Sequence, residues 1–303
     1  MDNSEISGRD SLNVPRVLGP KTRRGKKKMI NIALSFDDVL LRPQKSEIGT
    51  RKAVDIGTDL GTENFSLPII SSPMDTVTES EMAKTMSKWG GLGVIHRYNS
   101  VETQASLVRE ASTNNKPESS SCPVAAAVGV SDDFLRRVCA VYEAGARFIC
   151  VDVAHGHHTN VERALKKIKD TFAEEVIVIA GNVATHQAFL DLQSWGADAI
   201  RVGIGGGSIC STRIQTGHGV PTFQSLIDCA SAKQNAKIIA DGGIKSAGDI
   251  VKSIAAGADF VMLGSMLAGT TESPGEVFTD NNSKKYKVYR GMASKKAQMD
   301  WRG

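Results

Sequence analysis

The chain has 303 residues, of which 41% are hydrophobic and 23% charged, an ordinary composition for a globular protein. No segment approaches the ~18–20 consecutive apolar residues that cross a bilayer, and the first residues lack the apolar core of a secretory signal. The five cysteines (Cys122, Cys139, Cys150, Cys210, Cys229) are scattered and form no CxxC pair, which argues against a disulfide framework and a zinc site. We therefore expect a reduced, cytoplasmic protein without a membrane segment.

The net charge of +4 comes from the N-terminus. Residues 1–28 contain eight Lys or Arg against three Asp or Glu, which leaves a net charge of −1 for the rest of the chain. This stretch has no apolar periodicity, so it predicts a disordered basic tail over 1–28, followed by a folded domain over 29–303. The tail could touch RNA or another anionic surface, or have no function. The folded domain carries no charge pattern that predicts a nucleic-acid partner.

From Met29 onward the chain repeats one unit, a short apolar run followed by a polar or glycine-rich loop and an amphipathic stretch. The eight apolar runs are continuous rather than alternating, which is typical of strands buried on both faces of a parallel sheet. They are LPIISSPMD (67–75), GLGVIHR (91–97), PVAAAVGV (123–130), RFICVDVA (147–154), VIVIAGNV (176–183), AIRVGIG (199–205), KIIADGG (237–243) and FVMLGSML (260–267). The stretches between them have apolar residues at helical spacing.

Eight evenly spaced strand-and-helix units predict an α/β protein with a (β/α)8 TIM barrel, all eight strands being present. A doubly wound sheet is the alternative, and it is disfavoured because no GxGxxG follows the first strand. The polar stretch 112–121, STNNKPESSS, predicts a mobile linker between the second and third units.

In a barrel the loops after the strands share one face, and that face carries the chemistry. The polar residues expected there are Ser72, Asp75, His96, Asp152, His155, Asn182, Asp241 and Ser265, together with the segment 203–212. This segment reads GIGGGSICST, and its glycines expose carbonyls that can bind a monovalent cation and amides that can bind phosphate. Together with the glycines after the seventh and eighth strands, it predicts a phosphorylated small-molecule substrate. The glycines could also serve only to make tight turns.

Cys210 follows the sixth predicted strand and is expected to face the same mouth. A thiolate is a strong nucleophile that suits attack on an electron-poor carbon next to nitrogen. Thr212 could hydrogen-bond a water or a leaving group. Residue type alone leaves catalysis and packing equally open for Cys210, whereas the other cysteines are expected to be packing residues. His155, His157 and His158 lie on one loop, and we expect no zinc site from them.

Eight longer stretches are similar to motifs of one known family. They are LSFDDVLLRP (34–43), SSPMDTVTES (71–80), VDVAHGH (151–157), AGNVAT (180–185), RVGIGGGSICST (201–212), ADGGI (240–244), GSMLAGTTESPGE (264–276) and YKVYRGMAS (286–294). In these motifs the chain resembles the IMP dehydrogenase / GMP reductase family from Met29 to its end.

The resemblance implies an oxidoreductase that acts at C2 of a purine nucleotide (IMP, XMP or GMP), with NAD or NADP as cofactor. Catalysis would fall to Cys210, which forms a covalent adduct, and to Thr212. The nucleotide would contact Ser72, Met74, Ser208, Asp241, Gly243, Gly264, Ser265, Tyr289, Gly291, Met292 and Ala293. The dinucleotide would face Asp152, Asn182, Arg201 and Gly203. A potassium ion would be bound by carbonyls of Gly205, Gly207 and Cys210.

The chain departs from the family pattern in two places. The stretch 112–121 stands where IMP dehydrogenases usually carry CBS modules, and the chain stops at MDWRG, where the family continues into a mobile flap and a closing helix. We therefore expect the final helix of the barrel to be absent. The family resemblance implies a homotetramer for a complete chain.

Three functions remain open. Most of these motifs favour an IMP dehydrogenase-type enzyme, which converts IMP and NAD to XMP and NADH. The missing CBS modules and the pair Thr216-Gly217 favour a GMP reductase, which converts GMP and NADPH to IMP and ammonia. A truncated pseudoenzyme that binds nucleotide without turning it over is the third.

Overall fold

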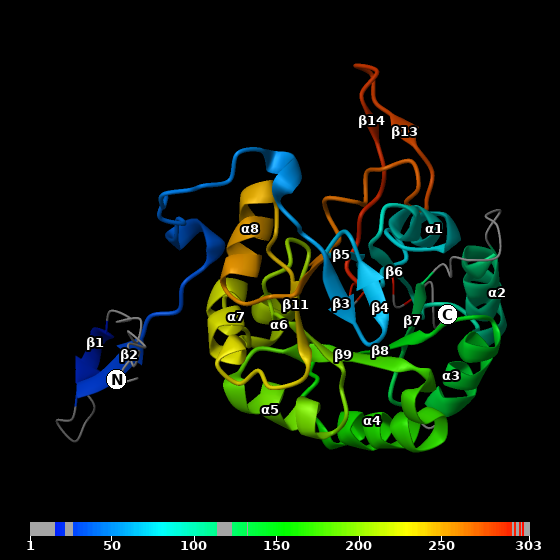
Figure 1. The fold of residues 1–303 in the computed structure, drawn as a ribbon, viewed down its shortest axis with the longest axis horizontal. Coiled ribbons are helices and arrows are strands. Elements are labelled where there is room, and N and C mark those ends of the chain that lie inside the picture. The colour runs from blue at the N-terminus through cyan, green and yellow to red at the C-terminus, as the bar shows by residue number, and fades with distance from the viewer. Residues whose placement is uncertain are drawn as a thin grey trace, which may run out of the picture.

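The computed structural model describes residues 16–21, 27–113, 123–131, 133–292, 294, 297 and 299. Eight parallel strands close into a barrel in the order β10-β11-β12-β5-β6-β7-β8-β9 (Figure 1). Each strand falls within one of the eight apolar runs, which confirms the predicted (β/α)8 class. The strands are β5 (Ile69–Ser71), β6 (Leu92–Ile95), β7 (Val124–Val128), β8 (Phe148–Asp152), β9 (Ile177–Val183), β10 (Ala199–Val202), β11 (Lys237–Asp241) and β12 (Phe260–Leu263).

Helices cover the outside of the barrel between successive strands (Figure 1). They are α1 (Ser80–Lys88), α2 (Val101–Ser112), α3 (Phe134–Glu143), α4 (Thr159–Phe172), α5 (His186–Ser194), α7 (Thr222–Ala230) and α8 (Ala247–Ala255). Ser100, Thr185 and Ser246 cap three of them, because each hydroxyl accepts a hydrogen bond from a backbone N–H of the first turn. A short helix, α6 (Thr212–Thr216), lies between β10 and α7. No helix is named within the described residues 264–292, which follow β12.

The core has two parts, one inside the barrel and one between the barrel and the helices. Alternate residues of a strand point to opposite faces, so each strand contributes to both parts. On β7, Ala125 and Ala127 belong to the inner core, whereas Val124, Ala126 and Val128 belong to the outer core. All five side chains are buried, which explains why the apolar runs are continuous in sequence.

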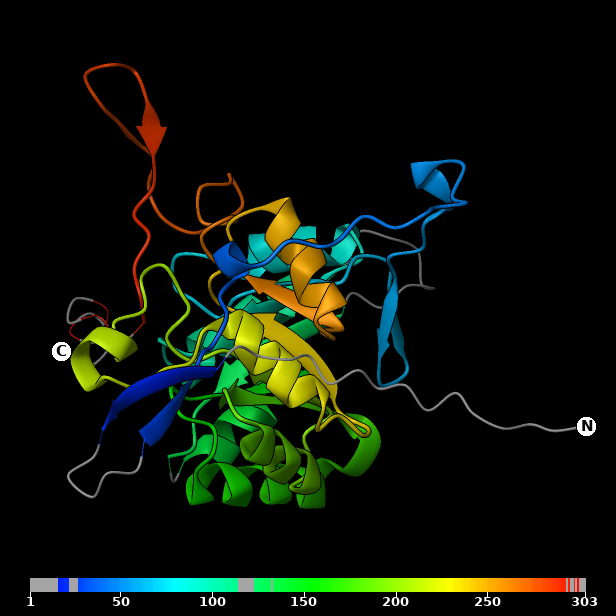
Figure 2. The same ribbon diagram turned by 90° about the vertical axis from the view of Figure 1, so that its left-hand side faces the viewer.

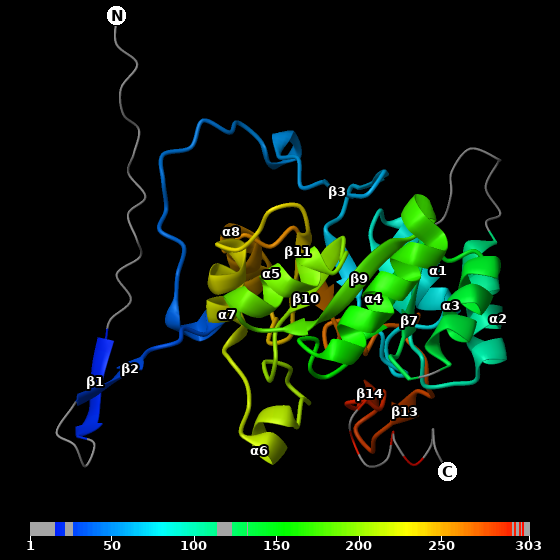
Figure 3. The ribbon, with the colours of Figure 1, turned by 90° about the horizontal axis from the view of Figure 1, so that it is seen from below.

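A hairpin closes the end of the barrel at which the strands begin. It consists of β3 (Thr58–Leu60) and β4 (Glu63–Phe65), and it buries Phe65 in the inner core. The Phe65 ring meets the rings of Phe148 and Phe260 edge-on, with centroids 5.9 and 5.5 Å apart. Phe148 and Phe260 are the first residues of β8 and β12. The hairpin therefore lies at the opposite end of the barrel from α6 and β14 (Figure 3).

Two further small sheets lie outside the barrel. β13 (Phe278–Thr279) and β14 (Lys285–Tyr286) form a hairpin that extends away from it (Figure 2). β1 (Arg16–Lys21) and β2 (Lys27–Asn31) pair antiparallel within the segment that composition predicts to be disordered. The structure thus differs from that expectation for residues 16–21 and 27–28, where Val17 and Leu18 pair with the apolar Ile30 and Met29.

Much of the rest of the basic tail lies outside the described residues, as does the linker from 114 onward. Three short 3-10 helices complete the described structure: η1 (Phe36–Asp38), η2 (Arg51–Ala53) and η3 (Ala173–Glu175). In the described part of the chain, no helix combines the length and the apolar character that a bilayer crossing requires.

Truncating Phe65 tests the closure of the barrel by the hairpin. Phe65→Ala should lower the free energy of unfolding by ~3–5 kcal/mol, because it leaves a cavity between Phe148 and Phe260. Leu40 is 89% exposed, so Leu40→Ala should change it by less than ~0.5 kcal/mol. Denaturant unfolding of the two variants measures both values. A loss below about 1 kcal/mol for Phe65→Ala would contradict the packing described here.

Candidate active site

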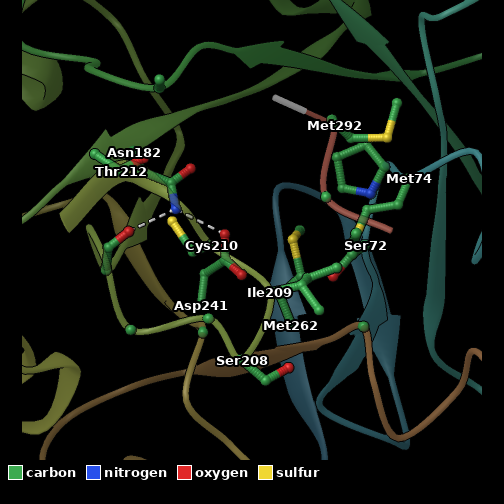
Figure 4. A pocket seen from close by; sticks show the side chains of 18 of the residues that line it. Ser72, Met74, Asn182, Ser208, Ile209, Cys210, Thr212, Asp241, Met262 and Met292 are labelled. Carbon is green, nitrogen blue, oxygen red and sulfur yellow. Dashed lines mark hydrogen bonds between the residues drawn. The ribbon is translucent and has the colours of Figure 1, made fainter. Parts of the chain in front are cut away.

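A cavity of about 270 Å³ opens at the end of the barrel where the strands finish. Its walls come from the loops after β5, β6, β8, β9, β10, β11 and β12 and from the segment that begins at Tyr289. Figure 4 shows Asn182, Cys210 and Asp241 on one side of the cavity, and Met74 and Met292 on the other. One side of the cavity thus carries an amide, a thiol and a carboxylate, and the other carries two thioethers.

The loop after β10, residues 203–211, forms one wall and is called the cysteine loop below. It starts at Gly203, where a Cβ would lie 1.9 Å from the carbonyl oxygen of Asp241. Only glycine permits this approach, and its φ of +146° also favours glycine. A backbone bridge between Ile204 and Val220 closes the base of the loop. The fold therefore holds the start of the cysteine loop against β11.

The end of the cysteine loop presents a thiol to the cavity. The N–H of Cys210 donates to the carbonyl of Gly207 at 3.1 Å, which turns the chain just before α6. Cys210 is half-buried, and it lines the cavity together with Thr212, the first residue of α6. The thiol is accessible from the cavity and is not packed inside the barrel wall.

Asp241 ends β11 and turns its carboxylate toward the cavity. Its Oδ2 accepts hydrogen bonds from Asn182 Nδ2 at 2.7 Å and from Arg201 Nε and Nη2 at 3.1 and 2.9 Å. Among the described residues none donates to Oδ1. Because one oxygen accepts all of these bonds, the other can accept the hydroxyl of a ligand.

Arg201 lies in the strand β10 and is only 6% exposed. Its Nη1 donates to Asp152 Oδ1 at 2.5 Å and contacts Cys150 Sγ at 3.6 Å. Burial lowers the pKa of this guanidinium, but the carboxylates of Asp241 and Asp152 outweigh burial and hold the pKa well above its usual value. Arg201 therefore stays charged and joins the two carboxylates.

The chain returns to the cavity at residues 289–292. Arg290 pairs with Asp75 through Nε at 2.9 Å and through a second, shorter contact from Nη2, and the N–H of Asp75 lies 3.4 Å from Met292 Sδ. Gly291 packs against Ile209 of the cysteine loop. Burial, followed by the carboxylate of Asp241, raises the pKa of Tyr289, so its phenol stays protonated at neutral pH. The Asp75–Arg290 pair thus holds residues 289–292 in place as part of the cavity wall.

The structure brings the predicted site residues together, although nothing in it assigns their roles. Ala293 lies outside the described residues. The cavity is lined by all the others that the family resemblance names: Ser72, Met74, Asp152, Asn182, Arg201, Gly203, Gly205, Gly207, Ser208, Cys210, Thr212, Asp241, Gly243, Gly264, Ser265, Tyr289, Gly291 and Met292. Of the polar residues expected at the same face, Asp75, His96 and His155 do not line the cavity.

Several lining residues were not among those predicted. Arg97 and Tyr98 follow β6, and Arg97 Nη2 donates to the carbonyl oxygen of Asp152 at 3.1 Å. A basic residue two positions after a barrel strand was the available signal for Arg97. Ile209 and Met262 add apolar surface, for which the sequence gives no signal that separates them from the core.

The histidines have structural partners. His96 is buried and bonds Glu79 at 3.1 Å, His157 bonds Asp191 at 2.7 Å, and the His158 ring accepts the N–H of Asn160 at the start of α4. Among the described residues, no three His, Cys, Asp or Glu side chains gather as a group that could hold a metal ion.

Cysteine alkylation tests the exposure of Cys210. Burial raises the pKa of Cys150 and of Cys229 to about 12, so both thiols should resist iodoacetamide near neutral pH. Cys210 lines the open cavity and should react first among these three, as measured by peptide mass spectrometry. Labelling of Cys150 at the same rate as Cys210, in protein shown to be folded, would contradict this geometry.

Comparison with known proteins supports the resemblance. The family model described as IMP dehydrogenase / GMP reductase domain matches residues 33–302. The chain is 40% identical to an inosine-5'-monophosphate dehydrogenase of Borreliella burgdorferi, with 88% of this chain and 77% of that protein covered. It is 42% identical to an inosine-5'-monophosphate dehydrogenase of Cryptosporidium parvum, with coverage of 88% and 75%. For a GMP reductase of Buchnera aphidicola the identity is 37%, with coverage of 90% and 79%.

These matches extend over nearly all of the barrel and of the cavity walls, and the proteins they name are oxidoreductases. The chain belongs to the IMP dehydrogenase / GMP reductase family of enzymes.

Proposed function

We propose that this protein oxidises a purine nucleotide at C2 through a covalent adduct on Cys210, in the manner of an IMP dehydrogenase. The observation that carries the proposal is the place of Cys210. Its thiol lines the same cavity as the Asp241 carboxylate and the glycine-rich loops after β11 and β12. A nucleophile, an acceptor for hydroxyls and a set of backbone amides thus share one opening.

The nucleotide half of the site suits a ribose 5'-phosphate. Asp241 Oδ1 would accept a ribose hydroxyl, since Oδ2 already takes three hydrogen bonds. Ser208, Gly243, Gly264 and Ser265 would surround the phosphate with hydroxyls and amides, together with the protonated phenol of Tyr289. Ser72, Met74, Gly291 and Met292 would hold the base over the Cys210 thiol, with Ala293 following in sequence.

The proposed chemistry begins when Cys210 Sγ attacks C2 and forms a C–S bond, while the C2–N3 π pair moves to N3 and takes up the thiol proton. This proton is released again when the hydride leaves C2 and the C2–N3 double bond re-forms. A bound NAD would supply the acceptor for the hydride that leaves C2. Water would then replace the sulfur, which releases XMP and restores the thiol, and Thr212 would hydrogen-bond this water. The dinucleotide would lie toward Asp152, Asn182, Arg201 and Gly203, on the polar side of the cavity.

We further propose that potassium binds the cysteine loop through the carbonyls of Gly205, Gly207 and Cys210. The loop fits such an ion. Neither Gly205 nor Cys210 has a carbonyl that accepts a backbone hydrogen bond from the described residues, and the Gly207 carbonyl accepts only one. Neutral carbonyl oxygens are suitable ligands for a monovalent cation. The ion would hold the turn that presents the thiol.

A GMP reductase is the second candidate, which would use NADPH and release ammonia from C2. One comparison favours it. The alignment with the Buchnera aphidicola GMP reductase spans 282 positions for 90% of this chain, whereas the Borreliella burgdorferi dehydrogenase needs 315 positions for 88%. This one reductase therefore aligns with fewer gaps than this one dehydrogenase. A homotetramer for a complete chain, a cytoplasmic location and a TIM-barrel catalytic domain over 29–303 are further parts of the proposal.

The direction of reaction can be read from nicotinamide absorbance. IMP with NAD should give rising absorbance of the reduced nicotinamide, whereas falling absorbance with GMP and NADPH would instead assign the reductase. Calorimetric binding of IMP or GMP without turnover in either assay would favour the pseudoenzyme over both. Failure to bind any purine nucleotide would contradict the proposal as a whole.

Cys210→Ala should lower the turnover rate by roughly 10³-fold or more, since the covalent route is lost. Because the thiol is not proposed to hold the ribose or the phosphate, the Kd for the nucleotide should change little. Cys139→Ala is the matched control, because Cys139 lies on α3, away from the cavity. Unchanged turnover in Cys210→Ala would refute the covalent step.

Replacing K⁺ by Li⁺ at equal ionic strength should reduce the turnover rate, because the smaller ion is a poor match for the spacing of the backbone carbonyls. Nucleotide affinity should be affected less than turnover, since the proposed ion contacts only the cysteine loop. Equal rates in the two salts would remove potassium from the proposal.

A further inference from the structure

The last inward-facing positions of four neighbouring strands carry an unusual set of residues. Asp152 on β8, Arg201 on β10 and Asp241 on β11 each follow an inner-core residue by two positions. Those inner-core residues are Cys150, Ala199 and Ile239. Two carboxylates and one guanidinium therefore form the layer between the apolar inner core and the cavity.

The fourth strand of this set, β9, contributes Gly181, and its lack of a side chain makes the arrangement possible. Gly181 pairs in register with Asp152 on one side and with Arg201 on the other. A Cβ at Gly181 would lie 2.6 Å from Arg201 Cβ and 2.9 Å from the Arg201 carbonyl oxygen. Without that Cβ, the Arg201 side chain can cross β9 and reach Asp152.

The guanidinium uses opposite edges for the two carboxylates. Nε and Nη2 donate to Asp241 Oδ2, whereas Nη1 donates to Asp152 Oδ1. With 6% of its surface exposed, Arg201 has little area left for a ligand. Removing it would leave two partly buried carboxylates that repel one another and lack their main donor.

We propose that Arg201 is a positioning residue that fixes Asp241 and Asp152 together, so that one buried guanidinium supports both the nucleotide half and the dinucleotide half of the site. This inference rests on the proposed function for the identity of the two ligands. It narrows the role of Arg201, toward which the dinucleotide is proposed to lie. The carboxylates touch the ligands, and Arg201 acts through them.

Arg201→Lys is the direct test, because an ammonium keeps the charge but cannot bond both carboxylates in fixed directions. The Kd for the nucleotide and the Kd for the dinucleotide are each measured alone by calorimetry. Both should rise by roughly tenfold or more, because this is the effect of losing one charge-assisted hydrogen bond. Arg147→Lys is the matched control. Arg147 is exposed and precedes β8 at the opposite end from Asp152, so both Kd values should stay unchanged.

Gly181→Ala provides an independent variant that retains Arg201. The added methyl group should displace the guanidinium. The Kd for the nucleotide and the Kd for the dinucleotide should therefore both rise, as for Arg201→Lys. Thermal unfolding is followed for each variant to establish that it is folded. If Arg201→Lys does not fold, Gly181→Ala alone decides the outcome.

A double-mutant cycle distinguishes a positioning role of Arg201 from a general effect of its substitution on the structure. If Arg201 acts on the nucleotide through Asp241, adding Arg201→Lys to Asp241→Asn should cost little further nucleotide affinity. Additive losses would overturn the inference, as would a rise in the dinucleotide Kd alone or two unchanged Kd values in folded protein. If the parent protein binds neither ligand, the proposed function fails; if it binds both and the variants do so equally well, only the role of Arg201 fails.

Discussion

Closure of the parallel barrel is the constraint on which the rest of the structure depends. The strand order β10-β11-β12-β5-β6-β7-β8-β9 leaves no free edge, and all eight strands run in one direction. Every loop that follows a strand must therefore emerge at the same end. This brings Ser72, Asn182, Cys210 and Asp241, which are far apart in sequence, around one cavity. The β3–β4 hairpin fills the other end, so only one end of the barrel is open.

Asp152, Arg201 and Asp241 place charge in the layer of the barrel interior next to the cavity. Below it the inner core is apolar, with residues such as Ile179 and Phe260. Within the layer, Arg201 is surrounded by carboxylates, and this arrangement keeps a buried cation charged against the cost of desolvation. The same contacts orient Asp241, so the interaction that makes the buried charge tolerable also prepares the site. Stability and function thus rest on the same group of side chains.

The fold could be predicted from the sequence because the barrel strands are buried on both faces. Val124–Val128 reads as a continuous apolar run for that reason, and each of the eight runs contains one strand. Predictions were weaker where chain segments pair at the ends of the fold. The closure by Phe65 depends on contacts with Phe148 and Phe260, which no local pattern reveals. Strand β1 forms in a basic segment that composition alone predicts to be disordered.

The site was predicted as a set of residues but not as a network. Glycine spacing and the thiol located the cysteine loop, and family motifs located most of the other walls. The partners of Arg201 could not be inferred, because Asp152 and Asp241 lie 49 and 40 positions away in sequence. Arg97 was missed although it lies only two positions after the end of β6. Long-range polar contacts depend on register, and register comes only from the folded barrel.

Mass spectrometry of protein quenched with acid in the steady state shows whether sulfur bonds to the purine during turnover. A nucleotide-sized mass increase is expected on the peptide that contains Cys210, and only when nucleotide and dinucleotide are both present. Steady turnover with that peptide unmodified at every quench time, and with the same rate when Cys210 is replaced, would contradict the covalent step.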